Sequence, residues 1–92
     1  MIVRILGVGQ YRLPDAVFER ANAIDDRVQA AADAGDATAF RAALHELVEL
    51  IQREGAELAA EEFVGSDAVV PDPDTTLEEA RELLSAEGLI PD

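Results

Sequence analysis

Two amphipathic segments joined by a very short connection constrain this chain more than any other feature. The first begins at Pro14-Asp15 and ends at Gly35, with apolar residues at helical spacing: Val17, Ala21, Ile24, Val28 and Ala32. The second runs from a cap at Asp36 to about Glu54 before Gly55, with a single apolar stripe: Phe40, Leu44, Leu47, Val48 and Ile51. Because only residues 34–37 connect them, the two helices are predicted to pack antiparallel as a helical hairpin.

Extended segments are predicted on both sides of the helices. Residues 2–6 and 10–13 flank Gly7-Val8-Gly9, and glycines at both ends of a tight connection predict a β-hairpin. Residues 56–74 are predicted as a loop with one short strand at residues 68–70, closed by Pro71 and Pro73.

A short third helix is predicted near the end of the chain. Thr75 and Thr76 stand three residues before Glu78 and Glu79, which gives two overlapping capping-box registers. This helix is expected to point Leu77, Ala80 and Leu84 inward and to end at Gly88, after which Leu89 and Ile90 fold back on the core. The fold class is therefore α+β, as a single domain over residues 1–92: an N-terminal β-hairpin packed on a helical hairpin, with a short C-terminal helix.

The charge balance argues against several kinds of partner. Seven basic residues, all arginines, stand against 20 acidic ones and give a net charge of −13. The arginines are scattered, so neither a nucleic acid nor an anionic membrane surface is an expected partner. An excess of acidic residues together with the absence of lysine is typical of proteins from a salt-loving archaeon, and a GC-rich actinobacterium is the alternative source. The N-terminus does not resemble a signal peptide and no stretch is apolar enough to span a bilayer, which predicts a cytoplasmic location without membrane insertion.

Residues for catalysis or metal binding are sparse. The chain has no cysteine, and its one histidine, His45, lies in HELVE, where Glu49 takes the place of the second zinc-binding histidine of a helical zinc protease. We expect His45 to be solvated beside Arg41 and Glu49. Gly7-Val8-Gly9 lacks the third glycine and the following helix of a dinucleotide site, so the hairpin turn is preferred.

The acidic residues between the second and third helices could in principle gather a hard cation, but they lack calcium-loop spacing: Glu61, Glu62, Asp67, Asp72 and Asp74. A solvated loop is the preferred interpretation. Ser66 and Ser85 have no plausible base. No catalytic, cofactor-binding or metal-binding residue is predicted, and the chain is expected to bind rather than to catalyse.

The two ends of the chain resemble a known family. The opening MIVRILGVGQYRLP and the closing SDAVVPDPDTTLEEARELLSAEGLIPD are similar to the PspA-associated proteins (PspAA), companions of phage-shock protein A in actinobacteria and archaea. The resemblance covers essentially the whole chain, and its most specific parts are Gly7, Gly9-Gln10-Tyr11, Ser66-Asp67, Pro71, Thr76-Leu77-Glu78-Glu79 and Gly88-Leu89-Ile90-Pro91.

This resemblance implies a non-enzymatic adaptor or regulatory role in the envelope-stress response, beside a coiled-coil PspA-like partner. The acidic surface would suit basic patches on that partner, with Gln10 and Tyr11 on an exposed strand edge, or Leu89 and Ile90 in the tail, as candidate contacts. For Tyr11, half-burial with its hydroxyl at the surface is an equal alternative. Two other functions stay open: a self-associating homodimer, and a small-ligand or cation binder.

Overall fold

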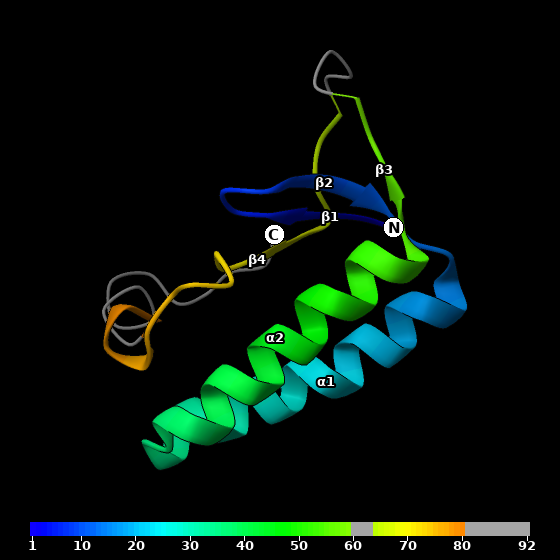
Figure 1. Ribbon diagram of the computed structural model, residues 1–92. Coiled ribbons are helices and arrows are strands. Elements are labelled where there is room, and N and C mark those ends of the chain that lie inside the picture. The colour runs from blue at the N-terminus through cyan, green and yellow to red at the C-terminus, as the bar shows by residue number, and fades with distance from the viewer. Residues whose placement is uncertain (60–63, 81–92) are drawn as a thin grey trace.

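A mixed sheet of four strands forms one layer of the molecule, and two long helices form the other (Figure 1). The computed structural model describes residues 1–59 and 64–80. The strands are β1 (Ile2–Ile5), β2 (Gly9–Arg12), β3 (Ala56–Glu57) and β4 (Ala68–Val70), in the order β3-β2-β1-β4. β2 runs antiparallel to both β1 and β3, whereas β4 runs parallel to β1. The predicted α+β class is confirmed.

The N-terminal hairpin forms as the sequence predicts. β1 and β2 pair from Ile2 opposite Arg12 to Ile5 opposite Gly9. Gly7 and Gly9 have φ values of 80° and 148°, which L-residues with a side chain rarely adopt. A Cβ at Gly7 would also overlap the carboxylate of Asp72, and this side chain would have to move aside. The glycines therefore serve the turn, and the turn is followed by a strand.

The helical hairpin is also confirmed. α1 (Asp15–Ala34) ends at Gly35, whose φ of 71° lets its N–H donate back to the Ala32 carbonyl. α2 (Ala37–Glu54) begins after Asp36, whose Oδ1 accepts a hydrogen bond from the Ala39 N–H at 3.0 Å. The connection is short enough that the two helices lie side by side beneath the sheet (Figure 1).

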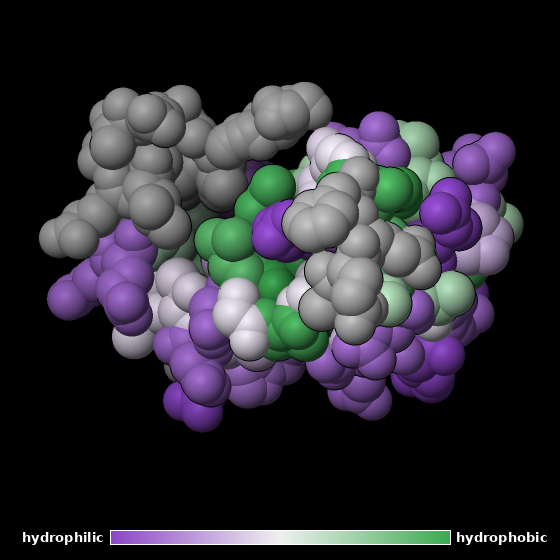
Figure 2. Space-filling view, turned by 90° about the horizontal axis from the view of Figure 1, so that it is seen from above, coloured by the Kyte–Doolittle hydropathy of each residue, from purple (hydrophilic) through white to green (hydrophobic). Residues whose placement is uncertain are grey.

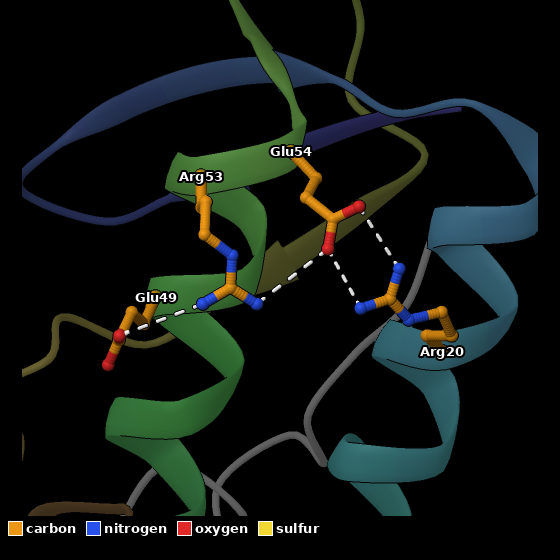
Figure 3. A network of polar contacts seen from close by, with 4 residues as sticks. All are labelled: Arg20, Glu49, Arg53 and Glu54. Atoms are coloured by element: carbon orange, nitrogen blue, oxygen red, sulfur yellow. Dashed lines mark hydrogen bonds and ion pairs between the residues drawn. The ribbon is translucent and has the colours of Figure 1, made fainter.

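Ion pairs join the exposed rims of the two helices. Glu54 on α2 accepts from Arg20 on α1 at 2.8 Å and lies 3.7 Å from Arg53, which also reaches Glu49 (Figure 3). Arg27 and Glu46 form a second link between the helices, at 2.7 Å. These charges surround the helix contact without entering it, and no buried residue in the described part of the chain is polar or charged.

The core lies between the sheet and the helices. Strand alternation points Val3, Ile5 and Tyr11 toward α1 and α2, where they meet the predicted apolar stripes. Phe18 and Ile24 are only partly buried at its margin. The five largest side chains that are fully buried come from both layers: Ile5, Leu13, Leu44, Leu47 and Ile51.

The segment after α2 differs from the prediction at one point. Residues 56–57, expected in a loop, form β3, because the free edge of β2 supplies partners: the Leu58 N–H donates to the Gln10 carbonyl at 2.9 Å. The predicted strand at residues 68–70 is confirmed as β4.

The third helix begins where the sequence placed it. Of the two capping registers, Thr76 with Glu79 is the one used: the Glu79 N–H donates to Thr76 Oγ1 and the Thr76 N–H donates to Glu79 Oε1. Helical residues follow from Leu77 and are described as far as Ala80, which is buried. The predictions for Leu84, Gly88, Leu89 and Ile90 fall outside the described residues.

Candidate protein-binding face

The outer face of the sheet is the candidate site. Since Val3, Ile5 and Tyr11 point toward the helices, alternation places their neighbours on the opposite side of the sheet. We call this surface the outer face and define it by Ile2, Arg4, Leu6, Gln10, Arg12 and Val69, with Val8 in the turn at its border. α1 and α2 both lie on the other side of the sheet (Figure 1).

Apolar side chains are unusually exposed on this face. Leu6, Val8 and Val69 are 42%, 38% and 37% exposed, and they make up three of the four large hydrophobic residues that are exposed in the described part of the chain. Figure 2 looks down on the sheet and shows apolar side chains gathered over its middle, next to strongly hydrophilic ones. Exposed apolar patches rimmed by polar groups are typical of surfaces that bind another molecule.

Two arginines accompany these apolar residues. Arg4 lies between Val69 and Gln10 in the cross-strand register, and Arg12 lies opposite Ile2, so the two arginines are diagonal neighbours on adjacent strands. Both are exposed. Within residues 1–59 and 64–80, the ion pairs use Arg20, Arg27 and Arg53 on the helices, and none involves Arg4 or Arg12. One exposed carboxylate lies beside them, since Asp67 Oδ2 accepts from the Ile2 N–H, so this face of a strongly acidic chain carries two arginines and one aspartate.

Gln10 is held from one side. Its Nε2 donates to the Val64 carbonyl at 3.0 Å and to Ser66 Oγ at 2.8 Å, and the side chain is half-buried. Gln10 and Ser66 therefore tie β2 to the segment that leads into β4. A contact between Gln10 and a partner stays a prediction.

Tyr11 does not lie where an exposed contact residue would. Its side chain is only 6% exposed and belongs to the core. Of the two equal expectations for Tyr11, exposure on an edge strand is wrong: alternation points its side chain toward α1 and α2, and β3 pairs with β2, so β2 is not an edge strand. The other predicted contacts, Leu89 and Ile90, fall outside the described residues.

His45 is exposed, as expected, and it also makes a hydrogen bond that was not predicted. The ring Nε2 lies 2.9 Å from the Pro73 carbonyl oxygen. Because a carbonyl can only accept, the ring nitrogen donates in this contact. His45 thereby links α2 to the turn at residues 72–74.

The acidic side chains near β4 hold backbone groups. Asp67 Oδ2 accepts from the Ile2 N–H at 2.7 Å, and Asp72 Oδ1 accepts from the Asp74 N–H at 2.8 Å, which forms an Asx turn. Glu61 and Glu62 fall outside the described residues. Across the rest of the chain, residues 1–59 and 64–80, no group of three histidine or carboxylate side chains is placed to hold a metal ion.

A hollow of about 280 Å³ lies between α1 and the β4 region, and no sequence pattern predicted it. Its lining is mainly apolar, with Asp25 and Asn22 among the polar exceptions. Burial raises the pKa of the Asp25 carboxyl, the neighbouring charge of Asp26 adds to this effect, and a hydrogen bond from Gln29 opposes it. Burial therefore destabilises the charged form of the Asp25 carboxylate.

The described structure defines a small two-layer α+β domain with one sheet face turned away from its helices. None of its described helices is long and apolar enough to cross a membrane. The chain belongs to the PspA-associated protein family (PspAA), whose family model matches residues 1–92. Neither the curated proteins nor the solved structures gave a match.

Proposed function

We propose that this protein is a non-enzymatic adaptor or regulator that binds a PspA-like protein in the membrane-stress response. The observation that carries the proposal is the match of the full chain to a family whose name states association with PspA. The outer face adds support, since exposed Leu6, Val8 and Val69 offer apolar area that a partner would remove from water.

The direct test is binding between the purified chain and the PspA-like protein of the same organism. Analytical ultracentrifugation and calorimetry in buffered KCl should give a defined complex with a Kd of about 10 μM or tighter. An unrelated coiled-coil protein of similar length and charge is the control. Equal binding to both proteins, or binding to neither, would refute the proposal.

Self-association is a second candidate that the same exposed apolar residues favour. A homodimer would show as a concentration-dependent sedimentation coefficient without any partner, and its affinity would rise with salt because two chains of charge −13 repel each other. A monomer at every salt concentration would remove this candidate.

A further inference from the structure

We propose that the outer face binds an acidic amphipathic helix of the partner. In this complex Leu6 and Val69 pack against the apolar stripe of the helix, and Arg4 and Arg12 pair with its carboxylates. The inference rests on the proposed function, because it takes the bound helix to belong to the PspA-like protein.

The shape of the surface favours a helix. A sheet with apolar residues on both faces is normally covered on both, and helices are a common cover. In the described structure α1 and α2 cover the face that carries Val3, Ile5 and Tyr11, whereas Leu6 and Val69 on the other face remain exposed. Both lie near the turn end of the hairpin, since Val69 pairs with Arg4 and the Leu6 N–H donates to the Val70 carbonyl. A single apolar stripe is wide enough to cover them.

The two arginines, Arg4 and Arg12, favour acidic side chains on that helix. Diagonal residues on neighbouring antiparallel strands lie about 7–8 Å apart, whereas carboxylates one helical turn apart lie about 5–6 Å apart at Cβ. The long guanidinium side chains of Arg4 and Arg12 can bridge that difference. The net charge of −13 suggests a basic partner instead, but exposed charges are largely screened beyond about 10 Å at 0.1 M salt, so the groups in contact decide the preference.

A second copy of this chain fits the face less well. A two-fold dimer whose axis passes close to Arg4 and Arg12 would bring these arginines near those of the other copy, and like charges in contact disfavour that arrangement.

The test compares charge reversal on the outer face with the same change elsewhere. Arg4→Glu should weaken binding to the PspA-like protein about tenfold at low salt, and less in 1 M KCl. Arg41→Glu is the matched control, because Arg41 is an exposed arginine on α2, away from the outer face, and it should bind like wild type. Leu6→Ala should also weaken binding about tenfold, and this loss should persist in 1 M KCl.

Two synthetic helical peptides separate the partner's chemistry from its identity. Both carry the same leucine stripe, flanked in one by glutamates at i and i+4 and in the other by lysines. The glutamate peptide should bind the full chain more tightly, and Arg4→Glu should remove the difference. Tighter binding of the lysine peptide would overturn the inference.

The remaining outcomes distinguish this inference from the proposed function. If the PspA-like protein binds wild type and Arg4→Glu equally, the inference is refuted and the adaptor role stands. If wild type binds the glutamate peptide and not the PspA-like protein, the proposed function fails together with the assignment of the helix to that partner. If Arg4→Glu lowers the melting temperature of the isolated chain far more than Arg41→Glu does, the face serves an intramolecular contact, and the inference is overturned.

Discussion

Replacing Gly55 with alanine is expected to destabilise the fold strongly, although Gly55 stands at an ordinary helix end. Its φ of −90° suits any residue, so backbone strain is not the reason. Space is the reason. A Cβ at Gly55 would lie 2.6 Å from the Ile51 carbonyl oxygen, 2.7 Å from Leu13 Cδ2 and 3.2 Å from Tyr11 Cβ. The end of α2 is thus pressed directly against β2 and the residue that follows it.

The expected magnitude follows from what must move. The Ile51 carbonyl is backbone and accepts the Gly55 N–H at 2.8 Å, so it can retreat only by opening the last turn of α2. Leu13 is fully buried, so its side chain can move only among other core residues. Overpacking of this kind costs about 1–3 kcal/mol, and weakening one hydrogen bond adds about 0.5–1.5 kcal/mol. We therefore expect a loss of about 2–3 kcal/mol, or a melting temperature lower by roughly 10–20 °C for a domain of this size.

The assay is urea unfolding followed by circular dichroism at one fixed KCl concentration. Gly65→Ala is the matched control, because no atom lies within 4 Å of a Cβ built at Gly65. The control should change the free energy of unfolding by no more than about 0.5 kcal/mol. If Gly55→Ala and Gly65→Ala unfold at the same urea concentration, the close approach inferred for α2 and β2 is refuted.

Three further changes test local interactions. Asp36→Ala removes the side-chain acceptor for the Ala39 N–H at the start of α2, and urea unfolding should show a loss of about 1 kcal/mol; an unchanged midpoint would contradict the cap. Because burial raises the Asp25 pKa, the native state binds more protons than the unfolded one between the ordinary and the raised pKa, and its stability falls as pH rises through that window. Asp25→Asn should therefore raise the melting temperature at pH 7, with the gain gone below the ordinary pKa of about 3.9, and an equal gain at every pH would refute the assignment. Hydrogen bonding to Arg27 lowers the Glu46 pKa, so the ion pair stabilises the fold above the ordinary pKa of Glu46 and stops doing so as pH falls through the lowered pKa. Arg27→Gln should therefore lower the melting temperature only slightly, and only at low salt and neutral pH. Thermal melts at low and high salt, and at neutral and acidic pH, check this.

Most of the helices and strands could be predicted from local sequence signals. The Asp36 cap, the left-handed Gly35, the glycines of the hairpin turn and the Thr76 capping box all act over a few residues, so they can be recognised without tertiary information. The apolar periodicity of the two helices likewise depends only on spacing along the chain. Membership of the PspAA family, which the ends of the chain suggested, is shown by the match over residues 1–92.

The candidate site depended on pairing between distant segments. An exposed strand edge was one of two equal expectations for Tyr11, but that edge of β2 pairs with β3, which lies more than 40 residues further along the chain, and Tyr11 pairs with Glu57. Nothing in the residues of β3 favours a strand; the free edge of β2 creates it. Gln10 was expected at the surface for a partner, yet its amide is half-buried and bonded to Val64 and Ser66.

The sequence by itself determined where α1 and α2 begin and end, that they pack antiparallel, and where the third helix begins, because periodicity, caps and glycines act locally. Only the tertiary structure decided that β4 pairs in parallel with β1, that Gly55 must have no side chain, and that Leu6, Val69, Arg4 and Arg12 share one face of the sheet, opposite α1 and α2. Those properties depend on which surfaces meet across the fold, and strand alternation leaves either face of a short strand available until its partners are fixed.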